Sequence, residues 1–118
     1  MRLQAKVSCV FIFFCSAICS TNSMGHHSRA EFSSDVRVIE GDILSVHWRN
    51  PHPRIMLKVL NDAGQQETWD IKAWGAANLL NRLGVTGDLL NVGDRVRISG
   101  QVSSRRKYYF QGTNLLLP

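Results

Sequence analysis

The sequence predicts a mainly β domain with a single helix, and three observations lead to this fold class. Five segments of the 118-residue chain alternate apolar with polar residues over at least part of their length, as half-buried strands do. Between the third and the fourth, residues 76–83 change to a helical period. The first segment contains a glycine and a shift in apolar phase, which is typical of a bulged, coiled strand. The order β-β-β-α-β-β is the connectivity of the OB-fold, a five-stranded Greek-key barrel.

The first strand is predicted over residues 36–48 and changes its inward face part of the way along. Its apolar positions are first Ile39, Gly41 and Ile43, and then Val46 and Trp48. The tetrapeptide Asn50-Pro51-His52-Pro53 follows as a tight connection, because two prolines cannot continue a hydrogen-bonded ladder. We therefore expect a bulge in this strand and a compact loop before the second one.

The other predicted strands lie at residues 54–60, 67–74, 95–102 and 108–117. Asn61-Asp62-Ala63-Gly64 signals a hairpin turn between the second and third strands. The helix over 76–83 ends at Gly84, where a C-cap glycine belongs, and residues 86–90 allow one further short turn. The helix thus has one place in the barrel, between the third and fourth strands.

The first 25 residues have the pattern of a signal peptide. Arg2 and Lys6 give a positive start, and residues 7–18 are a mainly apolar run of the length such peptides use. A membrane-spanning helix needs roughly 20 apolar residues, so we expect export to the periplasm or secretion, with no stable anchor after cleavage. Cleavage is predicted before His26; alternative sites stay open after Ser20 or Ser23, as does a lipoprotein cysteine at Cys19.

Cleavage at this point divides the chain into a signal peptide (1–25), an N-terminal arm (26–35) and a barrel domain (36–118). All three cysteines lie in the signal peptide, so the exported part has no disulfide, thiolate nucleophile or cysteine metal ligand. We find no phosphate-binding loop, no Gly-x-Ser-x-Gly or His-Glu-x-x-His motif and no plausible pair of catalytic carboxylates. The protein is therefore predicted not to be an enzyme.

Three histidines are candidate ligands for a transition metal. Once His26 is the first residue, its α-amine and its ring can bind one ion, and His27 or His52 can add another nitrogen. Such a nitrogen-rich set suits copper or zinc. The alternative is a solvated arm whose histidines have no specific role. His47 is expected to face solvent, and a metal shared with His52 would require the turn to bring the two together.

A second candidate site involves the two connections that flank the ligand face of OB-folds. Its predicted ligand-binding residues are Arg49, Asn50, Trp74, Arg105, Arg106, Lys107, Tyr108 and Tyr109. Trp48 and Trp69 fall on core faces instead. Cations beside aromatic rings suit an anionic ligand such as a polysaccharide, a phosphate group or a nucleic-acid backbone. The alternative is that the basic run at 105–107 is only a solvated hairpin tip.

Several short motifs are shared with a known family. They are His26-His27-Ser28, Gly41, Trp48-x-Asn50-Pro51-His52, Trp69, Asn78-Leu79-Leu80 and Gly93-Asp94-x-Val96. With these residues the sequence resembles an exported bacterial family, domain of unknown function 6152. The resemblance covers essentially the whole chain after the signal peptide and implies export and cleavage before His26, but no activity. Two positions depart from the family pattern: Arg29 replaces an aromatic residue, and Pro53 follows the Asn-Pro-His turn.

The leading hypothesis is therefore an exported, non-catalytic binding protein with an OB-like barrel that holds Cu or Zn through His26, His27 and His52. One alternative is a binder of an anionic ligand through the basic loop 105–107, and another is a protein-interaction adaptor. Because the protein is predicted to leave the cytoplasm, we do not expect nucleic acid to be a partner. The sequence leaves the oligomeric state open.

Overall fold

The computed structural model describes residues 30–118, and the structural statements that follow concern this part of the chain. The predicted signal peptide and the first residues of the predicted arm, up to residue 29, lie outside the described residues. His26 and His27 are among them. Within residues 30–118, no helix is both long enough and apolar enough to cross a membrane.

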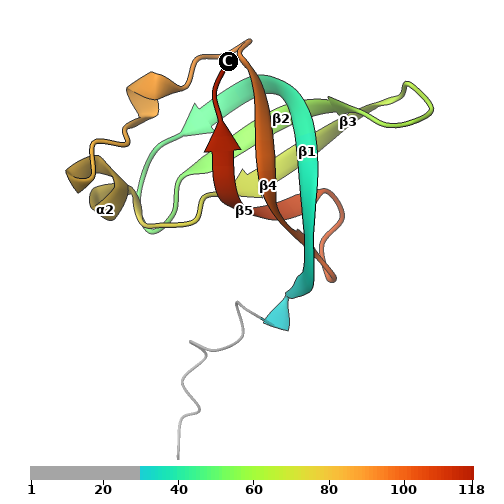
Figure 1. Cartoon of the computed structure of the whole chain (residues 1–118), viewed down its shortest axis with the longest axis horizontal. Coiled ribbons are helices and arrows are strands. Elements are labelled where there is room, and N and C mark those ends of the chain that lie inside the picture. Colours follow the sequence, from blue (N-terminus) through green and yellow to red (C-terminus); the bar gives the residue numbers. More distant parts are fainter. Residues whose placement is uncertain (1–29) are drawn as a thin grey trace, which may run out of the picture.

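The strands form a closed barrel in the order β1-β2-β3-β5-β4 (Figure 1). The element bounds are β1 Phe32–His47, β2 Arg54–Leu60, β3 Gln66–Lys72, α2 Ala77–Arg82, the 3-10 turn η2 Gly87–Leu89, β4 Arg95–Ser103 and β5 Tyr109–Leu116. The closing pair of strands, β3 and β5, is parallel, and the other pairs are antiparallel. The element order and this barrel topology confirm the predicted OB-fold class.

β1 holds the barrel together because it pairs with two different strands. Its first half pairs with β4 and its second half with β2, and it curves around the barrel between them (Figure 1). The register shifts between Ile43 and Ser45, which is the predicted bulge. The strand begins at Phe32, earlier than predicted, so residues 32–35 of the predicted arm are strand. Polar residues follow Phe32, and backbone pairing with β4 needs no apolar alternation.

Two glycines permit the close approach of strands that the small barrel requires. A Cβ at Gly41 would lie 2.5 Å from the carbonyl oxygen of Lys58 on β2. A Cβ at Gly100 would collide with the carbonyl oxygen of Gln111 on β5. Glycine at these positions therefore lets β1 cross β2, and β4 cross β5, at a distance that no other residue allows.

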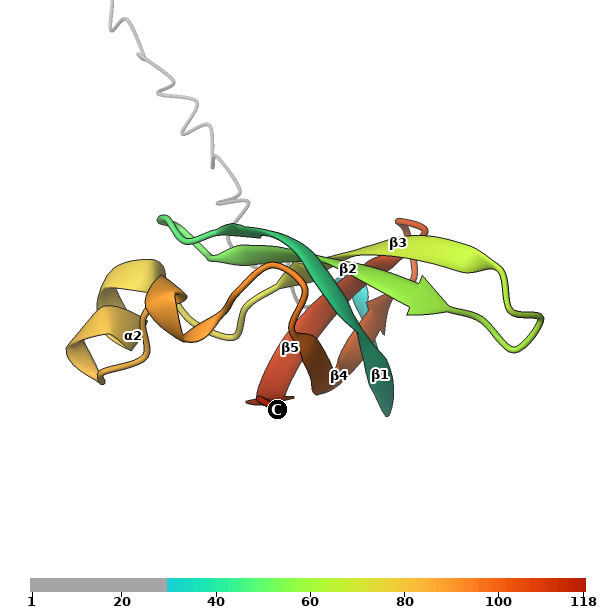
Figure 2. The same cartoon turned by 90° about the horizontal axis from the view of Figure 1, so that it is seen from above.

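The barrel interior is filled by apolar side chains from all five strands. The fully enclosed cluster is Ile43, Ile55, Leu57, Ile71, Val96, Ile98 and Phe110. These are positions that the sequence alternation places inward. Seen from above, α2 and η2 stand at one end of the barrel, and the β2–β3 hairpin projects at the opposite end (Figure 2). The strands thus form a rigid support for the connections at either end.

Candidate functional site

The connection between β1 and β2, residues 48–53, is fastened to α2 by alternate side chains. The indole N–H of Trp48 donates a hydrogen bond to Oδ1 of Asn81, at 2.7 Å. Oδ1 of Asn50 accepts one from the backbone N–H of Asn78, at 3.2 Å. This second bond satisfies one of the amide groups that the first turn of a helix leaves unpaired. The Trp-x-Asn part of the motif therefore docks the connection onto the helix.

His52 continues this pattern at the end of the connection. Its Nδ1 lies 3.4 Å from the carbonyl oxygen of Gly75, just before α2, and its ring is half-buried. Beside it, Pro53 is buried, and the Pro53 carbonyl accepts a hydrogen bond from the amide of Ala73 at 2.9 Å. Within residues 30–118, Nε2 of His52 has no hydrogen-bond partner. The imidazole is therefore held from one side, while its other nitrogen is unengaged by the described chain.

The same connection borders a surface groove of about 560 Å³. Its lining residues are His47, Arg49, Asn50, Pro51, His52, Arg54 and Met56. His47 and Arg54 are partners across the β1–β2 pair, and Ser45 is the partner of Met56, so all of these lie on the outward face. The turn thus brings His47 and His52 to one groove, which is the condition that the sequence left open for a shared metal.

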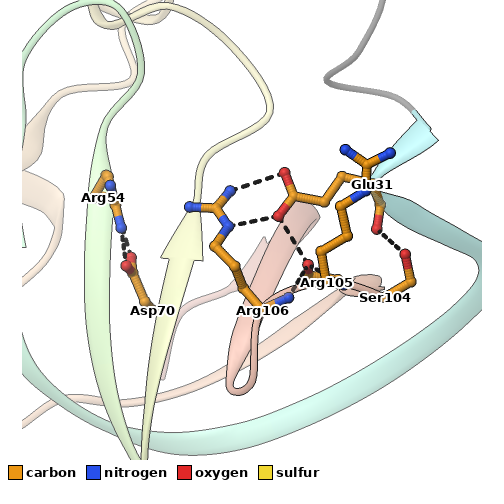
Figure 3. Close-up of polar contacts among 7 residues, drawn as sticks. Glu31, Arg54, Asp70, Ser104, Arg105 and Arg106 are labelled. Atoms are coloured by element: carbon orange, nitrogen blue, oxygen red, sulfur yellow. Dashed lines mark hydrogen bonds and ion pairs between the residues drawn. The ribbon is translucent and has the colours of Figure 1, made fainter.

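The charged residues that line this groove are Arg49 and Arg54, and Asp70 lies beside it as the partner of Met56 on β3. No carboxylate is found among its lining residues within the described chain. The guanidinium of Arg54 forms a two-point ion pair with Asp70 on β3, with Nε 2.9 Å from Oδ1 (Figure 3). Arg49 has no ion pair with any residue of 30–118. The lining residues therefore offer imidazole, thioether and guanidinium groups, which suit anions or metal ions bound by neutral nitrogen and sulfur donors.

The ring of Tyr109 joins this groove to the start of β1. Tyr109 is 6% exposed, and its ring centroid lies 5.6 Å from that of Phe32, the first residue of β1. The guanidinium carbon of Arg54, the first residue of β2, lies 5.5 Å from the same centroid. The side chains of Phe32 and Arg54, the first residues of β1 and β2, therefore contact the same aromatic ring.

A clamp of charged groups ties the residue before β1 to the β4–β5 connection (Figure 3). The Glu31 carboxylate accepts hydrogen bonds from Nε and Nη2 of Arg106, at 2.5 and 3.0 Å, and from Oγ of Ser103 at 2.9 Å. The Glu31 carbonyl accepts from the amide and hydroxyl of Ser104. The hydrogen bond from Arg106 lowers the pKa of Glu31, and the same bond raises the pKa of Arg106.

Arg106 also lies over Tyr109, with its guanidinium carbon 3.3 Å from the ring centroid. Its neighbours Arg105 and Lys107 are exposed and form no ion pair with any residue of 30–118. The Lys107 ammonium lies 4.6 Å from the ring centroid of Tyr108, which in turn contacts Trp69 at 5.5 Å. Within the basic loop, Arg106 is thus engaged in structural contacts, Lys107 lies on the aromatic pair of Tyr108 and Trp69, and Arg105 is exposed.

Trp74 lies in a different part of the molecule. It is 39% exposed, as predicted, but it lines a separate apolar hollow of about 220 Å³ at the α2 and η2 end. The other lining residues are Trp48, Val85, Thr86, Leu89, Leu90, Leu115 and Leu117. Trp48 is half-buried there, while Trp69 packs against the core, as predicted. Trp74 is therefore absent from the groove to which the sequence assigned it.

Apart from Trp74, the predicted site residues within residues 30–118 fall into three groups. Arg49 and His52 border the groove, and the exposed Arg105 and Lys107 lie in the neighbouring connection with the half-buried Tyr108. Those whose side chains are engaged by the described chain are Asn50, Arg106 and Tyr109. Four residues that line the groove were not among the predicted site residues, namely His47, Pro51, Arg54 and Met56. The alternation of the two strands places those on β1 and β2 outward, but the shape of the turn was needed to bring them together.

Comparison with known proteins gives a family and a fold. The model for the Family of unknown function (DUF6152) matches residues 15–111. No curated protein matches the chain. Two crystal forms of the mitochondrial single-stranded DNA binding protein Rim1 from S. cerevisiae are similar, each with 14% identity and a TM-score of 0.53. Each match covers 70% of this chain, and the two matches cover 92% and 91% of the respective Rim1 chains. At this identity the likeness shows the fold alone.

This likeness corrects one expectation from the sequence. We did not expect nucleic acid to be a partner, and the only ground was the predicted export. That expectation is wrong, because the barrel shares its fold with single-stranded DNA binding proteins. Nucleic acid is therefore among the anionic ligands to be tested.

Proposed function

We propose that this chain, which belongs to the Family of unknown function (DUF6152), is an exported, non-catalytic binding protein for a transition-metal ion. The proposed ligands are His52 from the groove and His26 and His27 from the segment before β1. Imidazole and amine nitrogens select copper or zinc over the hard cations that prefer oxygen. The lining of the groove, with two histidines and no carboxylate, supports this choice.

The observation that carries the proposal is the position of Tyr109. Its ring contacts both Phe32, at the start of β1, and the side chain of Arg54, which lines the groove with His52. The clamp between Glu31 and Arg106 fixes the point from which the preceding segment departs. From Phe32 back to His27, the chain can span at most about 18 Å. The proposal requires this segment to run back past Tyr109 toward the groove.

The proposal requires metal ligands from outside the described barrel. Within residues 30–118, no group of three His, Cys, Asp or Glu side chains is arranged to hold a metal ion. His47 and His52 supply two imidazoles, and an α-amine with further imidazoles supplies the rest. Processing of the chain before His26 would thus create the ligand set at the moment of export, outside the cytoplasm.

Calorimetric titration of the exported protein with Cu(II) and with Zn(II) tests the proposal. We expect one ion per chain, and we expect His52→Ala and His26→Ala each to weaken binding by about tenfold or more. Binding should weaken as the solution is made acidic, since imidazole must be neutral to bind a metal. Arg82→Gln, at an exposed position of α2 outside the groove lining, serves as the control and keeps the affinity. An affinity unchanged in both histidine variants would contradict the proposal.

A second candidate function is favoured by the basic loop. Arg105 and Lys107 form no ion pair within the described chain, and Lys107 lies beside the aromatic pair of Tyr108 and Trp69. Cations next to rings suit an anionic polymer, either a polysaccharide or a single-stranded nucleic acid. Such binding would weaken steeply as salt rises, and the double variant R105Q/K107Q would reduce that salt dependence. Metal binding depends chiefly on pH, so the two functions are separable in one set of titrations.

A further inference from the structure

The groove contains a sulfur ligand as well as its imidazoles. Met56 lies on β2, opposite Ser45 on β1, and is half-buried. Its neighbours along the strand, Ile55 and Leu57, point into the core. Met56 therefore directs its thioether outward, into the groove, instead of filling a gap in the barrel interior as methionine often does.

The pairing of β1 with β2 places Met56 near His47. His47 is opposite Arg54, so Met56 is its diagonal neighbour on the same outward face. Diagonal neighbours across an antiparallel pair have Cβ atoms about 7–8 Å apart, a separation that two long side chains can bridge with an ion between them. His52 borders the same groove, and its ring is held at Nδ1 by the Gly75 carbonyl.

We infer that this groove binds copper as Cu(I), through His47, His52 and Met56. The inference rests on the proposed function, since it concerns the same groove and shares His52 with the ligand set given above. Thioether sulfur favours Cu(I) among the metals that imidazole also binds. All three ligands are neutral, and no carboxylate lines the groove within the described chain.

The positive charge of Arg49, at the edge of the groove, favours the lower oxidation state of copper. Arg49 has no ion pair within residues 30–118, whereas Asp70 neutralises Arg54. The repulsion between a guanidinium and a metal ion is proportional to the charge of the ion. The electrostatic repulsion by Arg49 is therefore smaller for a singly charged ion than for a doubly charged ion bound by the same neutral ligands. The combination of two imidazoles with a thioether should therefore give the groove a higher affinity for Cu(I) than for Zn(II).

Anaerobic titration of the exported protein with Cu(I), in competition with a chromogenic Cu(I) chelator, tests the inference. We expect Met56→Leu, which keeps the shape of the side chain but removes sulfur, to weaken Cu(I) binding about tenfold or more. Its Zn(II) affinity should stay within about twofold of the parent. X-ray absorption of the Cu(I) protein should show sulfur and nitrogen neighbours, with the sulfur signal lost in Met56→Leu. His47→Gln should weaken Cu(I) binding in the same way.

The matched control relocates the thioether. Leu60 is exposed at the far end of β2, outside the groove, so the double variant M56L/L60M has the same composition of side chains but no sulfur at the site. It should not regain Cu(I) affinity. Circular dichroism before and after titration checks that each variant is folded.

The outcomes separate this inference from the proposed function. Cu(I) affinity that is unchanged in Met56→Leu, with Zn(II) and Cu(II) binding still dependent on His26 and His27, overturns the inference and leaves the proposed function standing. Cu(I) binding that depends on Met56, with Zn(II) and Cu(II) binding indifferent to His26 and His27, overturns the proposed N-terminal ligands and supports the Cu(I) groove. A protein that binds none of the three ions overturns both.

Discussion

The two connections beside the proposed ligand face are fixed by different forces. The β1–β2 connection is held to α2 by neutral hydrogen bonds, from the Trp48 indole and to the Asn50 amide oxygen. The β4–β5 connection is held to the chain before β1 by an ion pair between Glu31 and Arg106. Salt screens the second kind of contact and leaves the first almost unchanged.

This difference has a functional meaning for a metal-binding protein. The groove histidines sit on the neutral connection, so their positions should not shift with ionic strength. The segment that precedes β1 leaves from the charged connection, whose fastening depends on the ionisation of Glu31. The contacts that hold the groove histidines should thus be insensitive to salt, whereas the strength of the Glu31–Arg106 contact should depend on salt and pH. Four predictions test this contrast, from the largest effect to the smallest.

Replacement of Trp48 by Ala should destabilise the protein most. The indole donates to Asn81, and its ring supports η2, since a Cβ at Gly87 would lie 2.9 Å from Cβ of Trp48. We expect a loss of about 3 kcal/mol in the free energy of unfolding, at the low end for tryptophan because the ring is half-buried. Urea unfolding measures it. Trp74→Ala, on the same apolar hollow, is the control and should cost about 1 kcal/mol.

Asn50→Ala should lower the free energy of unfolding by about 1 kcal/mol, the usual cost of removing a side-chain acceptor at a helix start. The loss should be the same at low and at high salt, because neither partner is charged. Thermal unfolding at two salt concentrations checks this expectation. Arg49→Ala, next to it on the exposed side, should change the stability by less than about 0.5 kcal/mol. A salt-dependent loss in Asn50→Ala would contradict the neutral fastening.

Glu31→Gln should cost up to about 1 kcal/mol at low salt, since the pair with Arg106 is two-pointed but near the surface. Most of that loss should vanish in about 1 M salt, where the Debye length falls to about 3 Å. Asp35→Asn removes a carboxylate that has no ion pair within residues 30–118 and should have no such effect. An equal loss at both salt concentrations would show that the clamp acts through packing instead of charge.

The smallest effect is the pH dependence of the same contact. The hydrogen bond from Arg106 depresses the pKa of Glu31 in the folded protein. A depressed carboxyl pKa contributes stability that is full above the unfolded value of about 4.3 and is lost as pH falls through the lower folded value. The difference between the parent and Glu31→Gln should therefore shrink as the pH falls below about 5. The difference for Asn50→Ala should stay constant over the same range.

Local pattern was enough to predict the barrel, because its strands are short and its turns carry strong signals. The bounds of β2 at residues 54–60 follow from alternation between Pro53 and the Asn61 turn, and the structure has the same bounds. The bulge in β1 follows from the change of apolar phase after Gly41. The start of β1 was missed, because residues 33–35 are polar and the pairing of Phe32 with Ser103 on β4 is a long-range contact.

The site could be predicted only in part, since its geometry depends on contacts between distant segments. Nothing local in the sequence shows that Arg106 pairs with Glu31 or that Asn50 caps α2. The sequence therefore assigned both to ligand binding. His47 and His52 are near each other in the sequence, but only the path of the turn decides whether they border one groove. Residue type predicted the chemistry of the site, and topology decided which residues share it.

We propose above all that cleavage during export leaves His26 as the first residue and that this N-terminus completes a metal site on the barrel. This proposal is tested most directly by measuring the intact mass and the metal content of the protein recovered after export. We predict a chain that begins at His26 and holds about one copper or zinc ion, which is lost in the double variant H26A/H27A. A chain that retains its apolar leader, or a processed chain that holds no metal when supplied with equimolar ions, would contradict the account.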